Sequence, residues 1–297
     1  LMSSAHTNLD RILLPLDGSE SAASIVPYVE RLALGLGSSI HLLGVLSPIP
    51  AGDLPNDLTG TADVGAITQY IEIVKNRFEG SGLPVEVEIR EGQASVEILE
   101  SAAGHGCGLV ALSTRGRSAT GPNLLGITTD RIIRSSSIPV FVIPPDEDGG
   151  SVAPEGGVKT IVVGVDGSET ATSSLGPARQ VARKLGVDVV IVRSTPPPDP
   201  LGGAATYFDS VTHHAEQYVT RVSEQFSTDG LSTRTVVGSL SAHEQLLEAA
   251  DEADEPLLIL STRGWSNRAD WQLGSVTDRV VRTAKYPVLI IPPAGRG

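Results

Sequence analysis

The chain has 297 residues and a formal net charge of −13 at pH 7, from 22 lysines and arginines against 35 aspartates and glutamates. This acidic balance repels nucleic-acid phosphate, and because no cluster of basic residues opposes it, we expect no nucleic-acid binding. No run of about 18 apolar residues and no basic-then-apolar signal segment is present, and the single cysteine cannot form an internal disulfide, which predicts a soluble, cytoplasmic protein without membrane spans.

Apolar runs bounded by turn residues alternate with segments of helical periodicity along the whole chain. In chain order, the first half predicts strands at 11–16, 39–46, 84–92, 108–114 and 139–145, separated by helices at 19–37, 65–82, 95–106 and 128–136. The second half predicts strands at 160–165, 187–195, 232–238, 256–262 and 287–293, separated by helices at 169–186, 211–227, 241–253 and 276–284. This alternation predicts an α/β fold in which each half is a doubly wound, Rossmann-like domain with five parallel strands. Ligands of such sheets bind beyond the carboxyl ends of the strands, at the switch point.

Two blocks of sequence occur twice in the same order. The run ILLPLDGSESAAS of the first half returns as IVVGVDGSETATS in the second, and both halves contain STRG. The length also suits two domains of about 150 residues each. We therefore predict a duplicated domain at 9–145 and 158–293, joined by an exposed linker at 146–157 that is rich in proline, glycine and acidic residues.

An aspartate follows the first predicted strand of each copy, Asp17 in LDGSE and Asp166 in VDGSE. An aspartate before glycine closes a turn or caps the next helix. A carboxylate at this edge of the sheet can also accept hydrogen bonds from a ribose or a base. Both interpretations are open for both residues.

The fourth predicted strand of each copy leads into STRG, and a second glycine opens the next predicted helix. These pairs are Gly116 with Gly126 and Gly264 with Gly274. Glycine permits close backbone approach, and the free N–H groups and dipole of a helix start favour phosphate. Ser275 begins SVTD, which is close to a capping box, so a helix-capping role stands beside a phosphate-binding one.

With these pieces in order, the chain resembles the universal stress protein family in its tandem, two-domain form, from about Leu9 to Pro293. Family members carry a G-x2-G-x9-G-[ST] nucleotide motif on a doubly wound sheet, with an aspartate at the end of strand one. The resemblance implies two pseudo-two-fold related domains, edge-to-edge association of their last strands, and a homodimer of tandem chains. It also implies an adenine nucleotide as partner: ATP together with Mg²⁺, or AMP or ADP.

Carried over residue by residue, the resemblance implies a nucleotide site in each copy. In the second copy it falls on Val165, Asp166, Ser194, Gly238, Ser261, Gly264, Gly274, Ser275 and Val276. In the first copy it falls on Leu16, Asp17, Val45, Gly92, Ser113, Gly116, Gly126 and Thr128.

The chain departs from the motif at three positions. Ser113 and Ser261 stand where the motif has its first glycine, and Ile127 stands where a serine or threonine should follow the last one. A hydrogen bond to a charged phosphate contributes about 1.5–3 kcal/mol, or one to two decades of affinity, so its loss weakens a site without abolishing it. We predict that the second copy binds nucleotide and that the first is weakened.

Enzyme signatures are absent: the chain contains neither G-x4-G-K-[ST] nor GxSxG, so we predict no catalytic residue and at most slow ATP hydrolysis. We predict no metal site either, because His213 and His214 point to different helix faces, and His41 and His105 have no cysteine or carboxylate partner at ligand spacing. Trp265 and Trp271 lie in the second x9 segment, where they pack on a partner surface, cover the loop or stack on a ligand.

Three functional hypotheses follow. The preferred one is a stress-response, nucleotide-binding regulatory module whose assembly or partner choice changes with ATP or AMP. The second is a weak ATPase or adenylyl-transferring enzyme, which would show turnover beyond one product per site. The third is a nucleotide-independent interaction protein, which the serine-for-glycine changes and Ile127 support.

Overall fold

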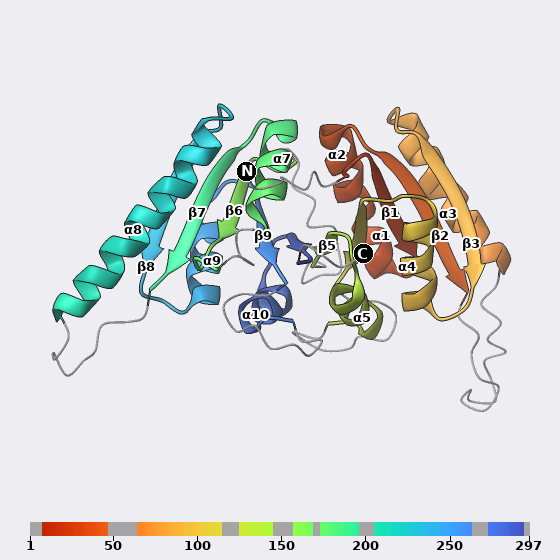
Figure 1. The fold of residues 1–297 in the computed structure, drawn as a ribbon. Helices are drawn as coiled ribbons and strands as arrows, with labels where there is room; N and C mark the ends of the chain where they lie inside the picture. Colours follow the sequence, from red (N-terminus) through yellow and green to blue (C-terminus); the bar gives the residue numbers. More distant parts are fainter. Residues whose placement is uncertain are drawn as a thin grey trace. The chain divides into compact units, whose positions relative to one another are not determined.

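The computed structural model describes residues 8–46, 64–114, 125–144, 157–168, 173–195, 205–262 and 273–293. These residues form two compact units, called here the first unit (8–144) and the second unit (157–293). Each unit is an α/β structure built on one parallel sheet (Figure 1). No helix within the described ranges is long and apolar enough to cross a membrane.

The first unit contains a five-stranded parallel sheet in the order β3-β2-β1-β4-β5. Its strands are β1 (Arg11–Leu16), β2 (Ser39–Leu46), β3 (Val85–Glu91), β4 (Leu109–Ser113) and β5 (Val140–Ile143). Its helices are α1 (Glu20–Ser24), α2 (Val26–Leu36), α3 (Val64–Gly80), α4 (Ala94–Gly104) and α5 (Ile127–Ser135).

The second unit repeats this topology, with strand order β8-β7-β6-β9-β10. Its strands are β6 (Thr160–Gly164), β7 (Asp188–Ser194), β8 (Thr233–Gly238), β9 (Pro256–Ser261) and β10 (Val288–Ile291). Its described helices are α7 (Leu175–Leu185), α8 (Ala205–Ser227), α9 (Ala242–Asp251) and α10 (Ser275–Thr283). The doubly wound, five-stranded fold predicted for each half is confirmed, and the switch points lie between β1 and β4 and between β6 and β9.

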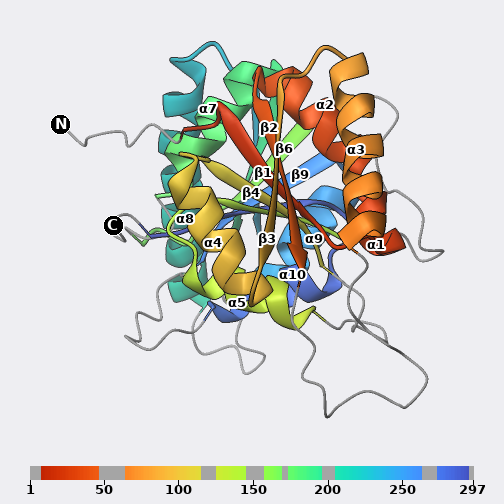
Figure 2. The ribbon, with the colours of Figure 1, turned by 90° about the vertical axis from the view of Figure 1, so that its right-hand side faces the viewer.

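Helices cover both faces of the sheet, so the central strands are apolar on both sides. In the first unit, α2 and α3 lie on one face and α4 and α5 on the other (Figure 2). Ile12, Leu13 and Leu14 of β1 are completely buried. Gly44 of β2 allows α3 to approach closely, because a Cβ atom at this position would lie 2.6 Å from Cδ1 of Ile71.

The strand registers make the two units comparable residue by residue. Ile40 of β2 pairs with Val85 of β3, and Val189 of β7 pairs with Thr233 of β8. Positions of β2 and β3 therefore have defined equivalents in β7 and β8. Residues of the neighbouring helices are matched between the units by their distance in sequence from these strands.

The prediction of one helix over 19–37 is wrong at Ile25, where α1 ends and α2 begins. Pro27 lies in the first turn of α2, where its missing N–H costs no hydrogen bond. At the other end, Gly37 is the C-cap with a left-handed φ of 69°, whereas Gly35 lies inside the helix.

Candidate functional site

The two aspartates that follow the first strand of each unit close turns. The backbone N–H of Ser19 donates to Oδ1 of Asp17 at 2.9 Å, and that of Ser168 donates to Oδ1 of Asp166 at 2.8 Å. The glycine after each aspartate is left-handed, with a φ of 77° or 84°. The turn-closing interpretation is therefore confirmed for both, and it holds each carboxylate at the carboxyl end of the sheet.

The start of α10 is held against the carboxyl end of β9 by two hydrogen bonds. The N–H of Gly274 donates to the carbonyl of Thr262 at 2.7 Å, and Oγ1 of Thr277 donates to the carbonyl of Ser261 at 2.8 Å. Gly274 is the N-cap, and no side chain of the described residues caps the helix. The first N–H groups of α10 have no acceptor within the helix and are directed outward from its start.

The first unit builds the start of α5 in the same way. Gly126 donates to the carbonyl of Thr114 at 2.8 Å, and Thr129 Oγ1 donates to that of Ser113 at 2.9 Å. Gly126 is the N-cap and has no side-chain cap either. The glycines that sequence analysis placed at these helix starts therefore occupy the same structural position in both units.

The residue after each of these glycines distinguishes the two units. Ser275 is the first helical residue of α10 and not its cap, so the capping-box interpretation is wrong. Ser275 is exposed to solvent. Ile127 takes this place in α5 and is 65% exposed, an unusual degree for a branched apolar residue. One helix start therefore presents a hydroxyl and the other a hydrocarbon.

The glycines predicted at the end of the third strand of each unit lie against helix side chains. Gly92, whose φ is 155°, follows β3, and a Cβ there would lie 2.4 Å from the Glu97 carboxylate. Gly238 ends β8 and accepts a hydrogen bond from the N–H of Thr195 at 2.8 Å. A Cβ on Gly238 would lie 1.8 Å from the Gln245 amide. Close packing thus accounts for both glycines without a ligand.

The remaining predicted residues are distributed as follows. Leu16 and Val165 are buried, and Val45, Thr128, Ser194 and Val276 are half-buried at the carboxyl ends of strands or in the first turns of helices. The predictions for Gly116, Gly264, Trp265 and Trp271 lie outside the described residues.

The structure adds three residues that sequence analysis missed. Tyr70 of α3 and Tyr218 of α8 occupy equivalent positions, and each hydroxyl is buried without a hydrogen-bond partner among the described residues. Burial raises the pKa of both phenols, and the carboxylates of Asp17 and Asp166 respectively add to the rise. The tyrosines therefore lie near the strand-one aspartates.

Arg193 is the third residue that sequence analysis missed. Its guanidinium carbon lies 4.7 Å from the ring centroid of Tyr218, and its nitrogens lie beside Gly167, in the turn after Asp166. The equivalent residue in the first unit is Gly44. An alignment of the two halves could have revealed this difference, because an arginine among the apolar residues of an inner strand is unusual.

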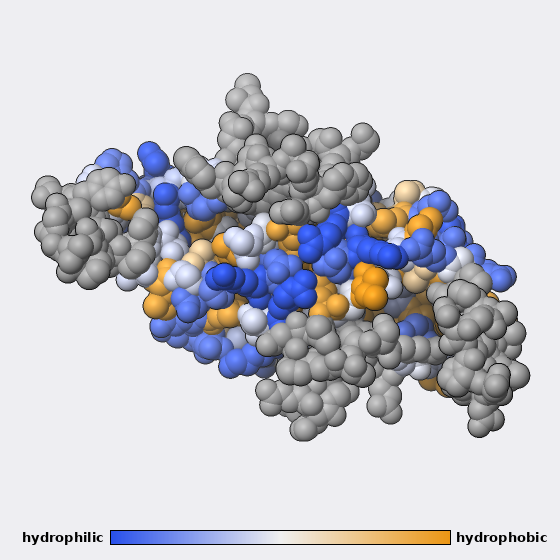
Figure 3. Space-filling view, turned by 90° about the horizontal axis from the view of Figure 1, so that it is seen from below, coloured by the Kyte–Doolittle hydropathy of each residue, from blue (hydrophilic) through white to orange (hydrophobic). Residues whose placement is uncertain are grey.

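Figure 3 shows the described residues coloured by hydropathy. Its described hydrophobic residues appear in small groups separated by hydrophilic ones.

His41 and His105 have a carboxylate partner in space that their sequence spacing does not reveal. Nε2 of His41 lies 3.2 Å from Oε2 of Glu88, and Nδ1 of His105 lies 3.7 Å from the same oxygen. By contrast, His213 and His214 are exposed on α8 with ring centroids 6.4 Å apart.

The profile of the universal stress protein family matches this chain twice, at residues 8–144 and 157–292. The chain belongs to the universal stress protein family. The two matches cover both structural units, so its tandem form is confirmed as well.

Two universal stress proteins match this chain over nearly their whole length. A universal stress protein of Mycolicibacterium smegmatis is 26% identical over 302 residues, which cover 95% of this chain and 97% of the relative. One of Mycobacterium tuberculosis strain H37Rv is 26% identical over 301 residues, covering 97% and 98%. The crystal structure of a universal stress protein from Archaeoglobus fulgidus has a TM-score of 0.72 at 20% identity, with 96% of this chain and 99% of that chain covered, which supports the fold.

Proposed function

We propose that this protein is a stress-response regulatory module that binds an adenine nucleotide in its second unit. The observation that carries this proposal is the start of α10, where a glycine N-cap, with no side-chain cap among the described residues, leaves backbone N–H groups beside the exposed Ser275. Such a helix start favours phosphate through its N–H groups and its dipole. Its position at the carboxyl end of β9, next to the switch point, is where ligands of doubly wound sheets bind.

The polar residues around strand β6 suit the nucleoside and its charge. We assign Asp166 to accept hydrogen bonds from ribose hydroxyls, as family resemblance implies. The buried Tyr218 hydroxyl has no partner among the described residues, and a ligand hydroxyl or base nitrogen would supply one. Arg193, which lies over the Tyr218 ring, adds a positive charge that favours an anionic ligand in a chain of net charge −13.

The first unit is proposed as the weaker site. Ile127 removes a hydroxyl from the phosphate position and exposes a branched apolar group there. Gly44 leaves this unit without the charge that Arg193 supplies. Both differences lower affinity for a phosphate and leave the fold unchanged.

A regulatory role is proposed in preference to catalysis. We assign no general base among the described residues of the site, and we therefore propose that hydrolysis of bound ATP is slow. We further propose that Mg²⁺ accompanies ATP, that the tandem chains form a homodimer in the cytoplasm, and that nucleotide occupancy changes this assembly or the choice of partner.

Paired aspartate variants test the proposal. Asp166→Ala should lower Mg-ATP affinity about 10–100-fold, whereas Asp17→Ala should leave the tighter binding unchanged. Equilibrium dialysis of labelled ATP against the full chain measures both, and circular dichroism checks the fold. Equal affinity in wild type and Asp166→Ala would refute the site, and multiple turnovers of ATP per site would favour the weak ATPase.

A further inference from the structure

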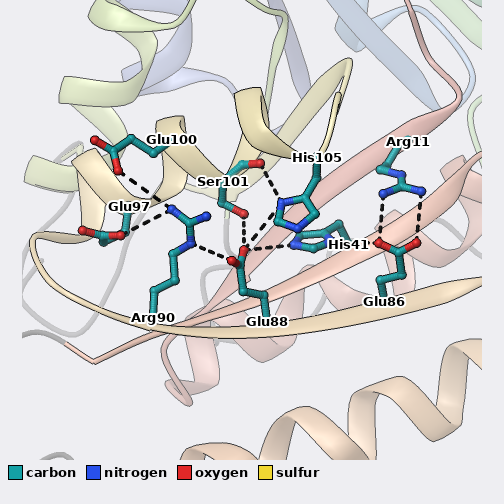
Figure 4. Close-up of polar contacts among 9 residues, drawn as sticks. All are labelled: Arg11, His41, Glu86, Glu88, Arg90, Glu97, Glu100, Ser101 and His105. Atoms are coloured by element: carbon teal, nitrogen blue, oxygen red, sulfur yellow. Dashed lines mark hydrogen bonds and ion pairs between the residues drawn. The ribbon is translucent and has the colours of Figure 1, made fainter.

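A second polar cluster lies in the first unit, away from the carboxyl ends of the strands. His41 is the third residue of β2, Glu88 lies on the neighbouring edge strand β3, and His105 is the C-cap of α4 (Figure 4). One nitrogen of each histidine and one oxygen of Glu88 all lie within 4.8 Å of one another. The cluster therefore brings three potential metal ligands to one place.

Strand register explains why these side chains converge. His41 pairs with Glu86 across β2 and β3, so the side chains of Glu86 and Glu88 point to the face that His41 occupies. Helix α4 packs on that face through β2, and its end carries His105 over the His41 ring. The two imidazoles stack with centroids 4.0 Å apart.

The ring nitrogens of the two histidines have different partners. Nδ1 of His105 lies 3.1 Å from the carbonyl of Ser101, which can only accept, so His105 carries its proton on Nδ1 and its lone pair on Nε2. A histidine that binds a metal ion through one ring nitrogen usually donates the N–H of its other ring nitrogen to a carbonyl or a carboxylate. In His41, Nε2 faces Glu88, whereas the buried Nδ1 makes no hydrogen bond among the described residues and lies 3.7 Å from Oε2 of Glu86.

Glu88 is held in place by two hydrogen bonds. Nε of Arg90 donates to Oε1 at 2.8 Å, and Oγ of Ser101 donates to Oε2 at 2.6 Å. These two hydrogen bonds fix the carboxylate of Glu88, whose Oε2 lies 3.2 Å from Nε2 of His41.

The second unit shows that the fold does not need this cluster. By strand register, Val190 and Val236 are the equivalents of His41 and Glu88. Leu109 of β4 and Leu257 of β9 occupy the same strand position. His105 and Ala253 precede these leucines by the same number of residues, so Ala253 is the equivalent of His105. The side chain of His41 is only 2% exposed, and polar groups are costly at a buried position that valine fills in the other unit.

We propose that His41, Glu88 and His105 bind a Zn²⁺ ion or a similar first-row transition cation. Two imidazoles and one carboxylate favour Zn²⁺ over Mg²⁺, which prefers oxygen ligands, and they leave a fourth position for water or a further ligand. The side chains of Glu88 and His105 are 23% and 31% exposed, which gives an ion a route from solvent. This site is independent of the proposed nucleotide site, which belongs to the second unit and lies at the carboxyl ends of that unit's strands.

Zinc binding to the metal-stripped full chain tests the proposal in the absence of nucleotide. Isothermal titration with Zn²⁺ against a competing chelator at pH 7.5 should reveal one tight site per chain. His105→Ala changes a half-buried residue to the one found in the second unit and should weaken binding at least about tenfold. Glu88→Gln, which keeps the side-chain size, should weaken it similarly.

Two further variants separate this site from adventitious binding and from misfolding. The triple variant His41→Val, Glu88→Val, His105→Ala installs the residues of the second unit and should fold while binding no Zn²⁺ tightly. The control variant His213→Ala, His214→Ala removes the exposed pair on α8 and should bind like wild type. Absence of a tight site in wild type, binding that survives His105→Ala, or binding that disappears with the α8 pair would overturn the proposal.

Discussion

The two units share one topology but place different chemistry at both ends of their strands. At the carboxyl ends, the second unit has Ser275 and Arg193 where the first has Ile127 and Gly44. Toward the amino ends, the first unit has the His41, Glu88 and His105 cluster where the second has aliphatic residues. The core and the strand registers carry the fold, so the polar positions around them can diverge independently in each copy.

Substitutions in the core that the two units share should cause the largest losses of stability, and these losses should be equal in the two units. Phe78 of α3 and Phe226 of α8 are equivalent and completely buried. Phe78→Ala and Phe226→Ala should each destabilise the unit that contains the change by about 3–5 kcal/mol. Urea unfolding measures this, with the exposed Ile73→Ala as a control expected to change stability by less than about 0.5 kcal/mol. A much smaller effect in one unit would show that the two cores are not equivalent.

The helix starts should respond unequally to the same substitution. Gly274 and Gly126 have φ near −60° and ψ near 143°, which valine tolerates. Gly274→Val should lower Mg-ATP affinity about 10–100-fold by obstructing the phosphate position, and Gly126→Val should leave the tighter binding unchanged. Fluorescence competition with a labelled nucleotide measures both. If Gly126→Val proves the more damaging change, the ranking of the two units is reversed.

Restoring the motif in the first unit should narrow the difference in nucleotide affinity between the two units. Ile127→Ser returns a hydroxyl to the start of α5, so affinity of the first unit should rise about tenfold. Because Ile127 is exposed, stability should change little. The gain is best measured in the Asp166→Ala background, where the second unit contributes least. No gain there would mean that Gly44, and not Ile127, limits the first site.

The smallest expected effect is an alkaline loss of stability confined to the second unit. Burial, with the hydrogen bond that Tyr286 donates to Asp251 at 2.8 Å, raises the pKa of Tyr286 to about 12. The unfolded phenol ionises near pH 10, so the contribution is present below about pH 10 and is lost as the pH rises toward 12. It amounts to at most about 1 kcal/mol, because Asp251 is half exposed. Tyr286→Phe should flatten this dependence in chemical unfolding at pH 9 to 12; an unchanged slope would exclude Tyr286 as its source.

Sequence alone predicted the architecture because strand and helix periodicities are local and the duplication repeats them. It also located the glycine helix starts, since their motif is contiguous with strands that are easily recognised. It missed the pairing of His41 with Glu88, because residues 47 positions apart meet only through strand register. It likewise missed Tyr218 and Arg193, whose proximity depends on how α8 packs on β7.

Calorimetric titration of Mg-ATP into the nucleotide-stripped full chain tests the central claim most directly. The predicted result is one tight site per chain, with an affinity about 10–100-fold lower in Asp166→Ala and unchanged in Asp17→Ala. Two equally tight sites would contradict the ranking of the units. No binding of ATP, ADP or AMP would contradict nucleotide recognition altogether and favour a nucleotide-independent interaction protein.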